Sequence, residues 1–211
     1  MADASFGGLP LTFGLVAGVA LAAAVRRRVG SRALPVDRAV VQTVLARLDD
    51  WMRRVMEEAG DNPDENEFDV NEYLFSWDDL EDSLGVPVLG YGGTRVVVRV
   101  APGVVAKLPW REQGVEQNAA EVDNYADADP RVKALLLAPL GMVDGASLYP
   151  EVEQLTAKDE TAPDYVRAVK AWGKLWQKNV PGTITTDHDT FKNWGRYQDR
   201  MVLIDCEPEE G

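Results

Sequence analysis

Residues 90–121 read GYGGTRVVVRVAPGVVAKLPWREQGVEQNAAE. A glycine cluster opens this stretch, two β-branched runs joined by an Ala-Pro-Gly turn come next, and a polar, helix-like segment ends it. Lys107 lies in the second run and Glu121 at the end of the helix-like segment. Glycines let a backbone approach a phosphate closely, and paired strands hold a lysine at a fixed distance from the turn. The stretch therefore predicts a phosphate-binding hairpin in which Glu121 fixes the position of Lys107.

The chain on both sides of this stretch continues as short apolar runs and helical segments. The apolar runs predict antiparallel strands at residues 86–91, 94–100, 103–108, 135–143 and 147–153, with short extended pieces at 183–186 and 201–205. Residues 112–128 and 163–178 are predicted helices. This order of elements predicts an α+β fold.

The N-terminal segment has a different character. Residues 6–25 carry no charge, and four arginines are found at positions 26, 27, 28 and 32. An apolar run of about 20 residues suits a membrane-spanning helix, and positive charge on its C-terminal side favours a cytoplasmic location for the domain after it. We therefore expect a single-pass membrane anchor whose Gly14 and Gly18 allow two such helices to associate. The alternatives are a buried helix of a soluble fold and a segment held in a protein assembly.

Residues 35–59 have apolar side chains at helical spacing, which predicts an amphipathic helix that packs on the domain or forms a stalk. Residues 60–67 form a turn-rich acidic linker. Three parts are expected: a membrane anchor at residues 1–32, a helix with its linker at 33–84, and a folded domain at 85–211.

Composition excludes several functions. A net charge of −13 argues against binding to a nucleic-acid backbone, because phosphates would be repelled. The acidic balance is typical of proteins from salt-rich cytoplasm, with an ordinary acidic protein as the alternative. Cys206 is the only cysteine and His188 the only histidine of the sequence, so neither an internal disulfide nor a Cys/His zinc site is expected.

Residues 89–207 resemble the protein-kinase-like superfamily, and more narrowly the compact kinase-like proteins of phages and archaeal mobile elements. Gly90, Gly92 and Gly93 look like the glycine-rich loop, although Arg95 stands where its third glycine is expected. The sequence Val-Val-Ala-Lys ending at Lys107 resembles the strand whose lysine holds nucleotide phosphates, and Glu121 resembles the acid on the αC-type helix that pairs with it.

The resemblance continues toward the C-terminus. Glu151 and Val152 resemble the hinge, whose backbone binds adenine. Residues 184–187 look like the approach to a catalytic loop, with Asp187 or Asp189 as the proton acceptor. Asn193 and Asp205 resemble the Mg²⁺ ligands of the family. The resemblance thus implies an antiparallel N-lobe sheet with an αC-type helix, a truncated helical C-lobe, and ATP and Mg²⁺ as cofactors.

The catalytic loop departs from the family pattern. The family's catalytic aspartate stands five residues before the asparagine, and this position is His188 here, flanked by Asp187 and Asp189. Asp205 is followed by Cys206 rather than by the Phe-Gly of the family motif. The sequence holds no segment that resembles the peptide-binding helices, so self-association or a partner protein is expected to complete the C-lobe.

Two functions remain open. The first is a membrane-anchored minimal kinase-like protein that binds Mg-ATP and phosphorylates a Ser/Thr side chain or a small-molecule hydroxyl. The second is a catalytically inactive kinase-like module, a pseudokinase, of a membrane or virion assembly. The altered loop favours the second, and the retention of Lys107, Glu121, Asn193 and Asp205 favours the first.

Overall fold

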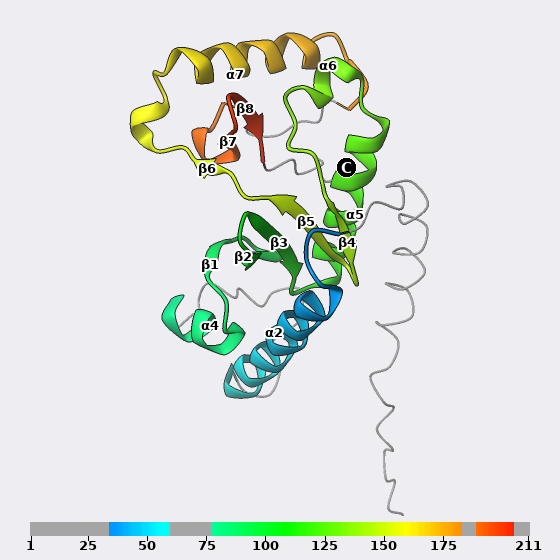
Figure 1. The fold of residues 1–211 in the computed structure, drawn as a ribbon, viewed down its shortest axis with the longest axis vertical. Coiled ribbons are helices and arrows are strands. Elements are labelled where there is room, and N and C mark those ends of the chain that lie inside the picture. Colours follow the sequence, from blue (N-terminus) through cyan, green and yellow to red (C-terminus); the bar gives the residue numbers. More distant parts are fainter. Residues whose placement is uncertain (1–33, 60–76, 183–188, 205–211) are drawn as a thin grey trace, which may run out of the picture.

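A computed structural model describes residues 34–59, 77–182 and 189–204 of the chain. These residues form two lobes, with helix α5 (Glu112–Asp127) running beside the junction between them (Figure 1). The lower lobe holds a sheet and two helices: α2 (Arg38–Ala59), α4 (Trp77–Leu84), β1 (Val88–Tyr91), β2 (Arg95–Ala101), β3 (Val104–Pro109), β4 (Gly141–Val143) and β5 (Ala146–Pro150). The upper lobe holds α6 (Pro130–Lys133), β6 (Glu153–Gln154), η1 (Ala157–Asp159), α7 (Pro163–Trp176), η2 (Phe191–Asn193), β7 (Trp194–Tyr197) and β8 (Arg200–Leu203).

The five-stranded sheet of the lower lobe is antiparallel, with the strand order β1-β2-β3-β5-β4. Gly103 makes the tight β2–β3 turn with a φ of 73°, a conformation that glycine adopts without steric cost. Side chains alternate between the two faces of a strand. Val96 and Val98 of β2 are buried on one face, whereas Val97 points to the cleft between the lobes.

Helices α2 and α4 cover the face of the sheet that carries Val96 and Val98. The apolar stripe of α2 packs there through Val41, Val44, Leu48, Trp51 and Val55. The β4–β5 turn also holds α2, because the carboxylate of Asp144 accepts hydrogen bonds from Arg38 and Gln42. Of the two roles expected for this helix, packing on the domain is the one observed.

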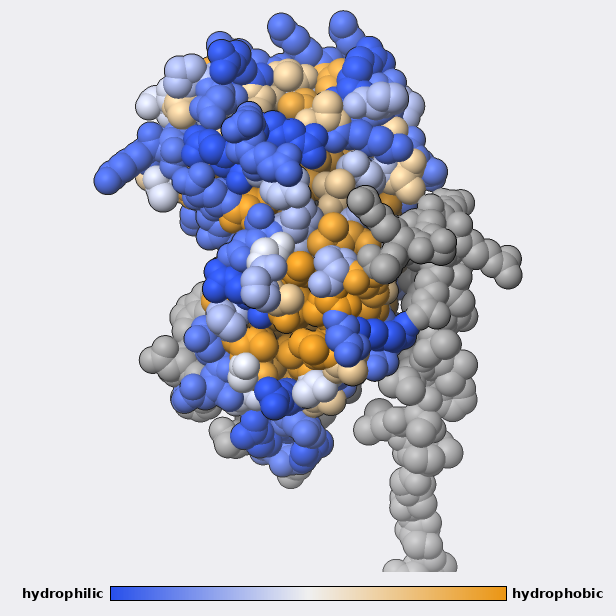
Figure 2. Space-filling model, viewed as in Figure 1, coloured by the Kyte–Doolittle hydropathy of each residue, from blue (hydrophilic) through white to orange (hydrophobic). Residues whose placement is uncertain are grey.

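The upper lobe has its own core around Trp172 of α7 and Trp194 of β7, which are both fully buried. Its sheet has the order β6-β7-β8. The amide of Leu203 donates to the carbonyl of Leu135 at 2.7 Å, and the amide of Leu137 donates to the carbonyl of Leu203 at 3.1 Å. These bonds join β8 to the segment that runs down from α6 to the lower lobe. Hydrophilic side chains dominate the upper lobe in Figure 2, while apolar side chains gather on the lower lobe.

The expected α+β class with an antiparallel sheet is confirmed. The predicted strand at 135–143 is wrong over most of its length, because only Gly141–Val143 form a strand. Residues 134–137 instead leave α6 and form a single bridge from Leu136 to Leu203. Strand β7 was not predicted, and the expected extended piece at 183–186 lies outside the described residues.

The predicted transmembrane helix is a further correction. In the described ranges, no helix is both long enough and apolar enough to cross a membrane. The longest of them, α2 with 22 residues, carries charges such as Arg47, Asp50 and Arg54 along its length. Residues 6–25, on which the prediction rested, lie outside the described residues. The single-pass localisation with a cytoplasmic C-terminal domain, which depended on this helix, is corrected with it.

Packing of α2 on the sheet predicts different effects for two neighbouring valines. Val41 is fully buried, whereas Val40 is 39% exposed. We expect Val41→Ala to lower the free energy of unfolding by about 2 kcal/mol, because two buried methyl groups are lost and a cavity remains. Val40→Ala should leave it nearly unchanged, since alanine has the higher helix propensity. Urea denaturation of both variants measures the difference, and equal effects would contradict the packing.

Candidate functional site

A cleft of about 750 Å³ lies between the two lobes. Its lower-lobe wall is the sheet face that α2 and α4 leave open, and its upper wall includes η2 and the end of β8. The lining residues are Leu89, Gly90, Tyr91, Gly92, Thr94, Arg95, Val97, Arg99, Val105, Lys107, Leu137, Tyr149, Pro150, Glu151, Val152, Gln154, Leu155, Phe191, Lys192 and Ile204. Most residues predicted to bind a ligand therefore lie around one space.

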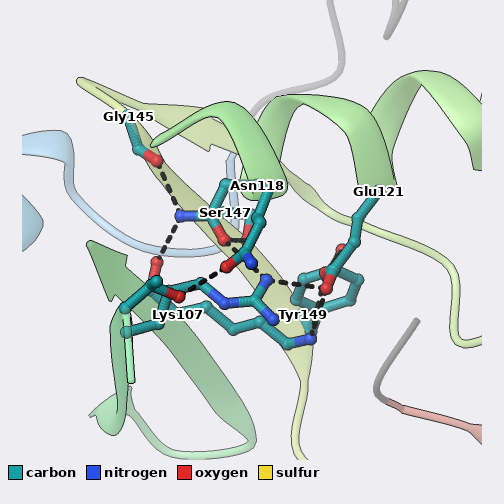
Figure 3. A network of polar contacts seen from close by, with 9 residues as sticks. Lys107, Asn118, Glu121, Gly145, Ser147 and Tyr149 are labelled. Atoms are coloured by element: carbon teal, nitrogen blue, oxygen red, sulfur yellow. Dashed lines mark hydrogen bonds and ion pairs between the residues drawn. The ribbon is translucent and has the colours of Figure 1, made fainter. Parts of the chain in front are cut away.

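Lys107 is one of the buried lining residues of this cleft, and it meets Glu121 at what we call the closed end of the cleft. The Nζ atom of Lys107 donates to both carboxylate oxygens of Glu121, at 3.0 and 2.9 Å (Figure 3). Both residues are more than nine-tenths buried. The contact expected from the sequence is therefore present, because β3 and α5 pack directly on each other. A buried ion pair of this kind holds the ammonium group in one position.

Two further side chains bind the same carboxylate. The Nη1 atom of Arg95 donates to Oε1 of Glu121 at 2.6 Å, and the hydroxyl of Tyr149 donates to Oε2 at 3.0 Å. The ring of Tyr149 also lies under the ammonium of Lys107, with 5.4 Å between Nζ and the ring centroid. Strands β2, β3 and β5 thus converge on one glutamate of α5.

Asn118, one helical turn before Glu121, ties the same elements together. Its amide nitrogen donates to the carbonyls of Lys107 and Gly145, at 2.9 and 2.8 Å (Figure 3). Its amide oxygen accepts from the hydroxyl of Ser147 at 2.9 Å and from Arg95 at 3.3 Å. Asn118 is fully buried, so this network fixes the register between α5 and the sheet.

The glycine turn at residues 90–93 and the threonine after it are fixed by three hydrogen bonds. The amide of Gly92 donates to the carbonyl of Arg95 at 2.9 Å, and the indole of Trp110 donates to the carbonyl of Gly93 at 3.0 Å. The hydroxyl of Thr94 donates to the side-chain oxygen of Gln117 on α5 at 2.5 Å. A Cβ added to Gly90, Gly92 or Gly93 would meet nothing within 4 Å. Packing inside the protein does not require these glycines, and the space beside them is open to a ligand.

The other end of the cleft carries Arg99 and Glu151. Two guanidinium nitrogens of Arg99 donate to the carboxylate of Glu151 at 2.5 to 3.0 Å, and these hydrogen bonds lower the pKa of Glu151. The amide of Glu151 donates to the carbonyl of Gly103 at 2.9 Å. This amide therefore already has an acceptor in the β2–β3 turn. Glu151 and Val152 both line the cleft, and their role as an adenine-binding hinge stays a prediction.

The structure describes two of the four aspartate and asparagine residues predicted for catalysis and metal binding. Asp187 and Asp205 lie outside the described residues. Asp189 is exposed, and its carbonyl accepts a hydrogen bond of 2.6 Å from Tyr165, whose pKa is raised by burial. Asn193 ends η2, and its carbonyl accepts from the amide of Ile204 at 2.8 Å.

No binding role was predicted from the sequence for Arg95, Asn118, Ser147 or Tyr149. A signal for Asn118 existed, because residues three apart share one face of a helix and Asn118 precedes Glu121 by three. The alternation of strand side chains likewise puts Ser147 and Tyr149 on one face of β5. For Arg95 the signal was its position, because it stands where the third glycine of the glycine-rich loop is expected.

The cleft is rich in positive charge, in contrast with the acidic chain as a whole. Among the described lining residues Arg95, Arg99, Lys107 and Lys192 are cationic and Glu151 is acidic, and the carboxylate of Glu121 behind this lining pairs with Arg95 and Lys107, so the cations still outnumber the acids. An anionic ligand suits this lining better than a cationic or a neutral one.

Comparison of the chain with models of protein families, with characterised proteins and with solved structures found no match. Within residues 34–59, 77–182 and 189–204 there is also no group of three or more His, Cys, Asp or Glu side chains that would hold a metal ion. The ligand of the site must therefore be inferred from its geometry and lining.

The two glutamates of the cleft predict a large difference in stability. Glu121→Gln keeps the shape of the side chain but leaves Lys107 and Arg95 buried beside a neutral amide. We expect the free energy of unfolding to fall by about 3 to 5 kcal/mol, as when one partner of a buried ion pair is removed. Glu151→Gln is the matched control, since its pair with Arg99 is partly exposed and such pairs contribute little. Chemical denaturation measures both, and a similar small loss in both variants would contradict the role given to Glu121.

Proposed function

We propose that the protein binds ATP together with Mg²⁺ in this cleft, in the manner of the kinase-like fold that its sequence resembles. The observation that carries the proposal is the buried Lys107–Glu121 pair beneath an open glycine turn. A fixed ammonium group and nearby main-chain amides are the groups that bind nucleotide phosphates in such folds. The cationic lining of the cleft supports the same ligand class.

The remainder of the cleft suits a base and a sugar. Leu89, Val97, Val105 and Leu137 give it an apolar section between the glycine turn and Glu151. Nucleotide sites are mostly apolar pockets with a few placed polar groups, which matches this arrangement. In the proposed mode, the base packs against Val97 and Val105, and the phosphates extend toward Lys107.

For Mg²⁺, the residues to consider are Asn193 and Asp205. An amide oxygen and a carboxylate are hard oxygen ligands of the type that Mg²⁺ prefers. The carbonyl of Asn193 accepts a hydrogen bond from the amide of Ile204, whereas Asp205 lies outside the described residues. When bound, the metal ion would neutralise phosphate charge, and Asn193 and Asp205 would hold it.

Nucleotide binding predicts a thermal shift that depends on Lys107. With Mg-ATP at about one hundred times its Kd, the full chain should gain about 2.7 kcal/mol, a rise in Tm of roughly 5–10 °C. Lys107→Ala should abolish most of this rise, because the fixed ammonium group is lost. Lys158→Ala, on an exposed lysine of η1, is the matched control and should keep it. The full chain is required, since α2 belongs to the core. If wild type shows no rise, ATP binding is refuted.

Phosphoryl transfer is a second candidate function. It is favoured by the presence of Asn193 and Asp205 in the sequence and by the hydrogen bond that Tyr165 donates to the main-chain carbonyl of Asp189. The acceptor would be a Ser/Thr side chain or a small-molecule hydroxyl. The competing hypothesis is a nucleotide-binding module without catalysis, which the position of His188 in the loop favours.

Radiolabelled transfer from ATP distinguishes these two. If the protein is a kinase, Asp187→Asn or Asp189→Asn should lower the transfer rate at least about a hundredfold, since a general base contributes this much. The other variant should retain most of the activity and serves as the control. Equal background transfer in wild type and both variants would indicate the non-catalytic module.

A further inference from the structure

Arg95 occupies an unusual place for a buried arginine. It is the first residue of β2, directly after the glycine turn, and its side chain is on the cleft face of the sheet with Val97 and Arg99. It is 6% exposed and lines the cleft. In the resembled family pattern this position is a glycine, so the guanidinium brings charge to a place where only backbone is expected.

Contacts on both sides determine where the guanidinium lies. Its Nη1 atom donates to Oε1 of Glu121 and to the side-chain oxygen of Asn118. Oε1 of Glu121 also accepts from Nζ of Lys107. Because Arg95 and Lys107 contact the same oxygen atom, their charges lie next to each other at the closed end of the cleft. Both lie under the glycine turn, where a phosphate chain would end.

A pair of fixed cations favours a ligand with several adjacent negative charges. Arginine presents five N–H donors in a planar fork, which suits bidentate contact with phosphate oxygens. Asn118 and Glu121 hold this fork in one orientation, so little side-chain entropy remains to be lost when a ligand binds. A diphosphate or triphosphate brings more negative charge to these two neighbouring cations than a monophosphate does, so the guanidinium should contribute more to its binding.

We propose that Arg95 is a second phosphate-binding residue, which selects nucleoside di- and triphosphates and preserves part of their binding when Mg²⁺ is removed. The inference rests on the proposed nucleotide binding. The guanidinium would neutralise part of the phosphate charge, together with Lys107 and the metal ion.

The test is isothermal titration of the full chain with ATP, ADP and AMP, in Mg²⁺ and in excess EDTA. Wild type should still bind ATP in EDTA. Arg95→Gln should lower ATP affinity in EDTA about tenfold or more, as expected for loss of a charged hydrogen bond, and AMP affinity much less. Arg95→Lys keeps the charge without the fork and should fall between the two. Arg99→Gln, on the same face of β2, should change ATP and AMP affinities by the same factor.

Several outcomes would overturn the role of Arg95. One is loss of all wild-type ATP binding in EDTA. Another is a ratio of ATP to AMP affinity that stays the same in both Arg95 variants. An equal loss of affinity for all three nucleotides is one form of this result, and it would indicate that Arg95 only supports the fold. Binding in Mg²⁺ by wild type would then still uphold the proposed function. Absence of binding under both conditions would refute both proposals together. Circular dichroism of each variant shows that folded protein is compared.

Discussion

One buried carboxylate organises the centre of this protein. Glu121 accepts hydrogen bonds from Arg95, Lys107 and Tyr149, which come from three different strands. Removing a carboxylate from water is costly, and these donors together offset that cost. Helix α5 is therefore held against the sheet by polar contacts at its centre, with Asn118 completing them one turn earlier.

Such a polar centre depends on where the apolar core lies. Helices α2 and α4 bury the other face of the sheet, where Val96, Val98 and Leu148 are fully enclosed. Because hydrophobic burial on that face stabilises the fold, the cleft face of the sheet does not need to be apolar throughout. Strand β2 illustrates the division, with valines at 96 and 98 on the packed face and arginines at 95 and 99 on the cleft face. The packed face of the sheet thus contributes most of the hydrophobic stability, and the cleft face carries the groups proposed to bind a ligand.

The sequence predicted the features that depend on local spacing. The two-residue repeat of strands and the tight β2–β3 turn set the register that places Lys107 beside α5, so its contact with Glu121 was foreseeable. The contacts of Arg95 with Glu121 and of Tyr149 with Glu121 join residues 26 and 28 positions apart, and no local pattern encodes them. The prediction for residues 6–25 rested on hydropathy and on the arginines that follow, whereas the role of an apolar segment also depends on what surrounds it in the protein.

The two ends of the cleft differ in a way that bears on selectivity. At the other end of the cleft, Arg99 and Glu151 form a partly exposed ion pair. The attraction within such a pair is weakened by solvent screening and by the entropy cost of fixing two long side chains. At the inner end, Arg95 and Lys107 are enclosed and oriented by hydrogen bonds on several sides. Fixed, dehydrated charges interact more strongly with a ligand than exposed ones, and they lose less entropy when it binds. Discrimination between ligands should therefore depend mainly on the number of negative charges that reach the inner end, and less on the group that faces Glu151.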